Sequence, residues 1–395
     1  MIDPATQFLI QAEDIPKQPE DVRRWHGLQG AAFALAIHET ALAENRCILI
    51  IAEHSQSAQR LQQELAFFSG GAYPIDIFPD YETLIYDGFS PHQDILSDRL
   101  ALLSRAALDR AVVIVPAATL LLRLPPRAFL LGHNLRLQTG QRLDLSTLRR
   151  QLHASAYRAV DTVIEHGEFT VRGSVLDLFP MGAANPFRVE LFDDEIESIR
   201  TFDPETQLST GITDAIDTLP AREFPLSKEG IRLFQDQWHE QFGGNPRDCR
   251  MYQDVAQGQA PAGIEYYLPL FYTETETLLN YLPADLLLIT EAIANPIQSY
   301  WETAKSRYES LRYDLERPIL PPEALLLAED ELMGLLKAFP RLDRLKTFRK
   351  GARTFDTLPA PDLGIEDRAA DPFHRLRTHL ATQDARILIS AETPG

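Results

Sequence analysis

Short apolar runs alternate with helical patterns along the first part of the chain, and this alternation restricts the fold more than any other feature of the sequence. Residues 47–52 and 111–115 are continuous apolar runs of strand length, typical of strands buried on both faces. Residues 55–68 and 93–108 repeat apolar positions at helical spacing, and residues 75–78 supply a further short strand. Strands alternating with helices predict a parallel, doubly wound α/β sheet.

The alternation stops in the middle of the chain. Pro125 and Pro126 interrupt both helix and strand, and residues 169–202 then alternate in the manner of short strands joined by tight turns. We therefore expect a compact α+β domain at residues 124–214. Helices and strands alternate again after it, and residues 285–290, apolar from 286 to 289, predict a buried strand that could complete the first sheet.

Two further patterns occur near the end of the chain. Residues 341–362 combine prolines with a basic run, which is the composition of a solvated linker. Residues 386–392 repeat the strand pattern of residues 46–53 and predict the start of a further α/β domain. The basic run consists of Arg341, Arg344, Lys346, Arg349, Lys350 and Arg353.

Length and charge limit the possible classes of protein. A chain of 395 residues is too long for one compact core, so about two to four domains are expected. The 57 acidic residues outnumber the 38 basic ones and give a formal net charge of -19, which disfavours nonspecific nucleic-acid binding. Cys47 and Cys249 suggest neither a disulfide framework nor a zinc site. Without a secretory or membrane-spanning pattern, the chain is expected to be cytoplasmic.

A small-residue loop begins at Gly27, in the place where a phosphate-binding loop would open a helix. Such a loop needs a Lys that reaches the phosphates and a Ser or Thr hydroxyl on magnesium. Gly27 and Gly30 are present, but Phe33 and Ala34 occupy the Lys and hydroxyl positions. The phosphate charge would remain uncompensated, so the sequence favours a helix start that packs on a sheet.

A second nucleotide-binding element is also incomplete. An ATPase strand that holds magnesium ends in Asp-Glu, whereas the apolar run at 286–289 is followed by Thr290 and Glu291. The metal site would therefore lack its anchoring carboxylate. Two independent losses favour a degenerate nucleotide fold that binds no nucleotide.

A cluster of acidic residues near the middle of the chain has two interpretations. Asp193, Asp194, Glu195 and Glu197 could hold a metal in a nuclease. They are nearly consecutive, however, and alternation along a strand points neighbouring side chains to opposite faces. A solvated hairpin turn is the favoured interpretation, and no metal is expected.

The strand at residues 187–192 places alternate apolar residues on one face and leaves Arg188 and Phe192 on the other. If the first face is the core, Phe192 is exposed beside an arginine. Arg172 is a second arginine in the same acidic setting. Exposed arginine and aromatic residues dominate protein interfaces. The residues leave open the alternative that both arginines only neutralise neighbouring carboxylates.

Several long motifs resemble a known family. Residues 172–180 (RGSVLDLFP) and 194–203 (DEIESIRTFD) resemble the signature shared by the excision-repair protein UvrB and the bacterial transcription-repair coupling factors, the Mfd family. Residues 79–84 and 86–95 favour the coupling factors, and residues 261–267 extend the match. UvrB has an intact phosphate loop and an Asp-Glu strand, whereas the coupling factors, like this chain, do not.

The resemblance implies the N-terminal region of a coupling factor with a split fold. Domain 1 would be a degenerate P-loop NTPase-like parallel sheet, and domain 2 an inserted small α+β domain resembling domain 2 of UvrB. The implied divisions are 1–123 for domain 1a, 124–214 for domain 2, 215–342 for domain 1b, 343–370 for a linker and 371–395 for the start of domain 3.

The resemblance also implies a partner. In the family, domain 2 binds the repair protein UvrA, and the matching contact positions are Arg172, Arg188 and Phe192. The chain would be a non-catalytic module that recruits UvrA and links removal of a stalled RNA polymerase to nucleotide excision repair. Other parent domains are further expected partners, whereas ATP, magnesium, DNA and the polymerase would be bound only by parent regions beyond residue 395. The rival interpretations are an ATP-dependent, UvrB-like enzyme that binds damaged DNA, and a structural spacer.

Overall fold

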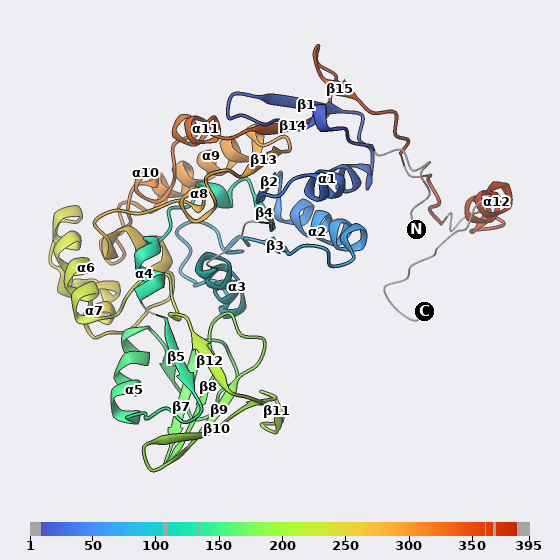
Figure 1. Ribbon diagram of the computed structural model, residues 1–395. Coiled ribbons are helices and arrows are strands. Elements are labelled where there is room, and N and C mark those ends of the chain that lie inside the picture. Colours follow the sequence, from blue (N-terminus) through green and yellow to red (C-terminus); the bar gives the residue numbers. More distant parts are fainter. Residues whose placement is uncertain (1–8, 106–109, 133, 360, 366–368, 385–395) are drawn as a thin grey trace.

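Two sheets organise the protein, each in its own part of the molecule (Figure 1). The computed structural model describes residues 9–105, 110–132, 134–359, 361–365 and 369–384. One sheet has seven strands and the other has six, and a separate two-stranded sheet pairs β5 (Leu135–Gln138) with β12 (Ala215–Thr218) where the chain enters and leaves the second part. The predicted combination of a parallel sheet and an inserted α+β domain is confirmed.

The seven-stranded sheet is parallel and has the strand order β15-β1-β14-β13-β2-β4-β3. Its central strands β13 (Leu287–Thr290), β2 (Ile48–Ala52) and β4 (Val112–Pro116) are buried along their whole length. The apolar runs therefore form strands as predicted, because both faces of a doubly wound sheet are covered. β3 (Ile75–Ile77) is the outer strand beside β4.

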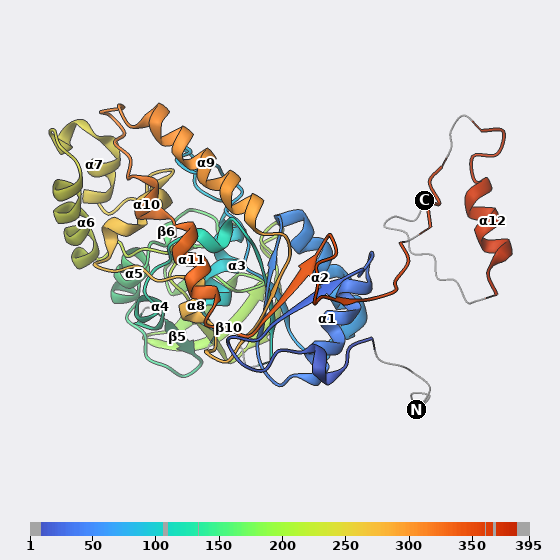
Figure 2. The same cartoon turned by 90° about the horizontal axis from the view of Figure 1, so that it is seen from above.

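Helices cover both faces of this sheet (Figures 1 and 2). On one face, α1 (Ala32–Ala43) and α2 (Ser55–Ser69) share a core with alternate residues of β2 and β4. On the other face, α3 (Gln93–Ser104) and α9 (Ala294–Leu311) join a larger core. α2 and α3 begin where their helical spacing predicts, and α1 begins just beyond Gly30, whose φ of 52° is left-handed.

The end of the sheet corrects one expectation. β1 (Val22–His26) pairs with both β14 (Arg341–Leu345) and β15 (Arg353–Thr354). The prediction of a solvated linker is therefore wrong for these two segments, and the sheet extends past residue 342. The physical reason is that Leu342 is fully buried while the charged neighbours of Leu342 form ion pairs.

The inserted domain is built on the six-stranded sheet, whose order is β11-β10-β9-β8-β7-β6. α5 (Leu145–Ala154) packs Leu148 and Leu152 into the core on one face of it. The strand pattern and the hairpin turn expected at Asp193 and Asp194 are confirmed. The strands are β6 (Arg158–Ala159), β7 (Glu168–Arg172), β8 (Val175–Leu178), β9 (Phe187–Phe192), β10 (Glu195–Phe202) and β11 (Ser209–Thr213).

The other helical elements lie elsewhere along the chain. They are η1 (Ala12–Asp14), η2 (Thr119–Leu121), α4 (Arg127–Gly132), α6 (Lys228–Gln241), η3 (Pro246–Asp248), α7 (Arg250–Ala256), η4 (Ile264–Phe271), α8 (Leu278–Tyr281), α10 (Pro322–Leu325), α11 (Glu329–Leu336) and α12 (His374–Thr382). The strand predicted at residues 386–392 lies outside the described residues. None of the helices described has the length and apolar character of a transmembrane segment.

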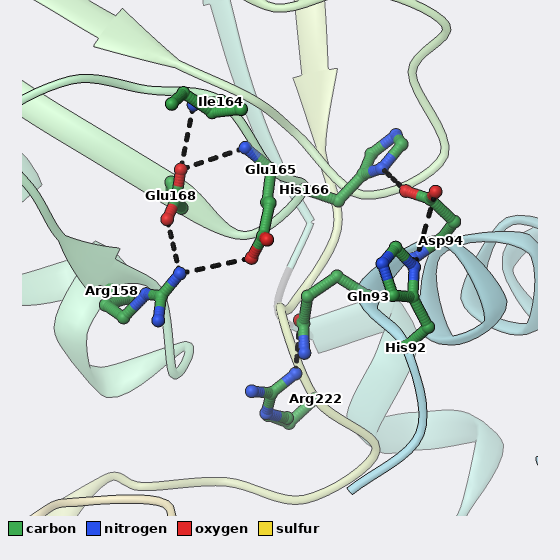
Figure 3. Close-up of polar contacts among 9 residues, drawn as sticks. All are labelled: His92, Gln93, Asp94, Arg158, Ile164, Glu165, His166, Glu168 and Arg222. Carbon is green, nitrogen blue, oxygen red and sulfur yellow. Dashed lines mark hydrogen bonds and ion pairs between the residues drawn. The ribbon is translucent and has the colours of Figure 1, made fainter.

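Polar contacts fix the inserted domain against the start of α3 (Figure 3). His166 Nδ1 lies 2.7 Å from Asp94 Oδ1, and its Nε2 lies 2.8 Å from the Ala183 carbonyl oxygen. The Gly182 N–H donates to Ser97 Oγ at 2.7 Å. Figure 3 also draws the contacts of Arg222 with Gln93 and of Arg158 with Glu165 and Glu168.

Candidate protein-binding surface and nucleotide-type crevice

The loop that follows β1 has the strand-loop-helix geometry of a phosphate loop, but the chain's own residues occupy its polar groups. Thr357 Oγ1 accepts from the Gln29 N–H at 2.8 Å and donates to the Gly27 carbonyl at 2.6 Å. Gly27 has a φ of 84°, and a Cβ there would lie 2.3 Å from the Phe355 carbonyl oxygen. The segment after β15 thus closes directly over the loop.

An arginine fills the space between this loop and the end of β13. The Arg344 Nη1 lies 2.8 Å from Glu291 Oε1, and its Nη2 donates to the Leu28 carbonyl at 3.2 Å. The guanidinium carbon also stands 4.2 Å from the centre of the Phe33 ring. Thr290, for its part, donates to Asp343 Oδ1 at 2.9 Å. Arg344 is therefore the counter-ion of the Glu291 carboxylate and comes from within the chain.

Phe33 and Ala34 are buried, with exposed fractions of 2% and 0%, which agrees with a helix start that packs on a sheet. The sequence analysis placed Arg344 in a linker and missed its contact with Glu291, because the strand β14 that positions it was not predicted. Whether this crevice binds a nucleotide stays a prediction at this point.

Asp193 and Asp194 of the acidic cluster form a hairpin turn between β9 and β10, as predicted, and Glu195 and Glu197 lie on β10. Asp193 takes the left-handed φ of 53° that such a turn requires, and Asp194 lies 4.0 Å from Arg142 Nε. The described residues hold no group of three or more His, Cys, Asp or Glu side chains arranged to bind a metal ion.

Arg188 lies on the sheet face of the inserted domain that is opposite to α5, and it is held by Asp177. The register places the two residues directly opposite each other. Nε and Nη2 of Arg188 lie 2.7 and 2.9 Å from the two carboxylate oxygens, and Asp177 is only 3% exposed. This hydrogen-bonded pair raises the pKa of the Arg188 guanidinium above its ordinary value. For Arg188, the neutralisation alternative describes the geometry correctly.

Arg172 and Phe192 lie on the same face as Arg188, and both are more exposed than Arg188. Arg172 pairs with Val175, which pairs with Glu190, so Arg172 and Glu190 share one cross-strand row. Arg188 and Phe192 flank Glu190 along β9. Arg172 is exposed and, among the described residues, donates only to the backbone carbonyl of Asp161, at 2.5 Å. Phe192 is 70% exposed.

The structure thus gathers the three predicted contact residues around Glu190. Phe192 is exposed as predicted, and Arg172 has no carboxylate partner among the described residues. Asp177 was missed as the partner of Arg188, because the register of β8 against β9 depends on a turn whose length the sequence does not fix.

Comparisons with known proteins show which protein family and which relatives this chain is similar to. The family described as UvrB interaction domain matches residues 135–224, the segment that contains the six-stranded sheet. The chain is 40% identical over 389 residues to the transcription-repair-coupling factor of Haemophilus influenzae, covering 97% of this chain and 34% of that protein. It is 40% identical to that of Escherichia coli (96% and 34%) and 26% identical to that of Bacillus subtilis (68% and 24%).

The chain spans about a third of the length of the first two relatives. The similarity nevertheless runs through both the seven-stranded sheet and the inserted domain, since it covers nearly the whole chain. The identities of 40% and the match of the inserted sheet to the UvrB interaction domain lead to the same family assignment. Over the span that it shares with these relatives, the chain belongs to the family of bacterial transcription-repair coupling factors.

Proposed function

We propose that this chain is a non-catalytic docking module that recruits UvrA to sites of transcription-coupled repair. The observation that carries the proposal is the exposed Phe192, held beside Arg172 and Arg188 on one face of a domain that matches the UvrB interaction domain. A well-exposed phenylalanine next to arginines has the composition of an interface hot spot. Arg172 can exchange its bond to a backbone carbonyl for a charge-assisted bond to a UvrA carboxylate.

Affinity measurements with purified UvrA test this proposal. Phe192→Ala is expected to weaken binding by about 2 kcal/mol, the cost of removing a buried interface anchor. Arg172→Glu is expected to weaken binding as well, because it places like charges opposite each other. Leu131→Ala and Arg232→Glu are matched controls, since these residues are 63% exposed and 83% exposed and lie outside the sheet face. Wild-type affinity in the double variant of Arg172 and Phe192 would refute the proposed surface.

Arg188 is a poor choice for this test. Its removal leaves the buried Asp177 carboxylate without a partner, and breaking a buried pair is strongly destabilising. A loss of UvrA binding in Arg188→Ala would therefore mix lost contacts with lost folding.

The non-catalytic part of the proposal is supported by the crevice at the end of the parallel sheet. Arg344 and Thr357 already satisfy Glu291 and the loop backbone, and Phe33 leaves no cation for a triphosphate. Neither ATP nor magnesium is expected to bind there, and both would act in other regions of the parent protein. DNA and RNA polymerase would be reached through those regions too, in the cytoplasm.

The rival function is an ATP-driven enzyme, and ligand-induced stabilisation distinguishes the two. A nucleotide at about 100 times its dissociation constant raises the unfolding free energy by about 2.7 kcal/mol. We expect no shift of the thermal midpoint with millimolar Mg·ATP, and a clear upward shift would support the enzyme.

A parent domain is also proposed to cover the surface in the resting protein. If so, this chain binds UvrA more tightly than the full-length protein does, and equal affinities would argue against such masking.

A further inference from the structure

The edge strand of the inserted sheet exposes an apolar side chain that the surface around Glu190 does not include. β11 (Ser209–Thr213) is the outer strand and pairs, among the described residues, with β10. It carries no charged residue, although edge strands are usually protected by charge or proline. Ile212 on β11 is 80% exposed, more than Phe192.

Register places Ile212 on the same face as the predicted contact residues. Ile212 lies opposite Arg200 on β10, and Arg200 lies opposite Arg188 on β9. Directly paired residues in a sheet point to the same face. Ile212, Arg200 and Arg188 therefore form one row across three strands, and Phe192 follows Arg188 along β9.

The charge of Arg200 in this row is partly available, whereas Arg188 is paired with Asp177. The Arg200 side chain is 43% exposed and lies 3.6 Å from Glu190, a separation typical of a weak, solvent-screened pair. The row thus offers an apolar side chain at the sheet edge, then a partly free guanidinium, with Phe192 as a second apolar group further along β9. A partner surface with apolar residues flanking a carboxylate would be complementary to it.

We infer that the docking surface extends to the sheet edge and that Ile212 is a second apolar anchor for UvrA, with Arg200 as a contact between the two anchors. This inference rests on the proposed function, since it assigns further residues to the same partner. UvrA is favoured as the partner because Ile212 and Arg200 continue the cross-strand row of Arg188, one of the residues already assigned to UvrA.

Two substitutions at Ile212 test the inference with purified UvrA and the whole chain. Ile212→Thr keeps a β-branched side chain and is expected to weaken binding by about fivefold, because it removes apolar contact area. Ile212→Glu also places a negative charge against the acidic partner and is expected to weaken binding by about thirtyfold or more. Leu131→Glu is the matched control, because Leu131 is an exposed leucine (63%) on α4, away from this row. Unchanged thermal midpoints verify that the variants are folded.

The outcomes separate this inference from the proposed function. If Phe192→Ala weakens UvrA binding while both Ile212 variants bind like the wild type, the edge anchor is wrong and the proposed function stands. If the wild type fails to bind UvrA, both are wrong. If light scattering finds a dimer that Ile212→Glu dissociates without changing UvrA affinity, the edge serves self-association and the inference is overturned. Weakening by both Ile212 variants with an unaffected Leu131→Glu supports it.

Discussion

Breaking the ion pair between Arg99 and Glu223 is expected to destabilise the junction of the two domains severely. The two side chains are 0% and 1% exposed, and Arg99 Nε lies 2.6 Å from Glu223 Oε1. The Tyr81 hydroxyl donates to the other carboxylate oxygen at 2.7 Å. The guanidinium also lies 4.2 Å from the Phe78 ring and 4.1 Å from the Tyr81 ring. Glu223 belongs to the segment that returns from the inserted domain, so the pair connects α3 to that segment.

The magnitude follows from desolvation. Glu223→Gln leaves the buried Arg99 charge without a counter-ion, and removing one partner of a buried pair costs about 3–5 kcal/mol. A double variant with Arg99→Met and Glu223→Leu buries no charge, so its loss should be smaller than that of either single variant. Typical total stabilities are about 5–15 kcal/mol, so the single variants should lose a large share of their stability.

Urea unfolding followed by circular dichroism measures these losses, with the first transition taken as the unfolding of the junction. Asp236→Asn is the control, because the Arg232–Asp236 pair on α6 is 83% and 65% exposed and should change stability by less than about 1 kcal/mol. Losses under about 1 kcal/mol in the single variants, or losses that simply add in the double variant, would refute the reasoning.

Three further outcomes follow from other contacts. Gly27→Ala should destabilise by about 1–3 kcal/mol, because φ is 84° and the added Cβ would meet the Phe355 carbonyl; wild-type stability in chemical denaturation would contradict this. Asp94→Asn should cost about 1 kcal/mol or less, since it weakens a partly exposed contact with His166, and a larger loss would mean that this contact holds the domains together. Burial lowers the pKa of His38, so its stabilising contribution is present above about pH 6.5 and is lost as the pH falls through the lower pKa of the folded state. His38→Gln should therefore reduce the loss of stability between pH 7 and pH 5, and an unchanged slope would exclude His38 as its source.

The strands of the sheet centre could be predicted, whereas those at its end could not. β2 and β4 are apolar at every position and therefore stand out in the sequence. β1 and β14 mix charged with apolar residues, and some of their charges are neutralised by residues that only the fold brings close. Arg344, for example, reaches Glu291, which lies far away along the chain. A basic run with prolines was therefore indistinguishable from a linker.

The candidate site shows the same limit. Alternation along β9 was enough to place Arg188 and Phe192 on one face, because the period of a strand is a local property. The partner of Arg188 depended on the pairing of β8 with β9, which is a long-range property. Ile212 was not noticed for a related reason: its position beside Arg200 arises from the register of β10 with β11, and Ser-Thr-Gly-Ile-Thr alone gives no sign of which face is covered.

The contacts of the arginines decide how the docking surface would respond to salt. Arg188 is bound to Asp177 through two hydrogen bonds, and its charge is largely cancelled before a partner arrives. Within the described part of the chain Arg172 is bound only to a backbone carbonyl, so its charge is available for long-range attraction of an acidic partner. Exposed charges of this kind act mainly on the association rate and are screened by salt. Association of UvrA with Arg172→Ala should therefore be slower at low salt and less sensitive to added salt than with the wild type, whereas Arg188→Lys should retain the wild-type salt dependence. Stopped-flow kinetics at several salt concentrations measure both, and an identical salt slope for Arg172→Ala and wild type would remove Arg172 from the electrostatic part of docking.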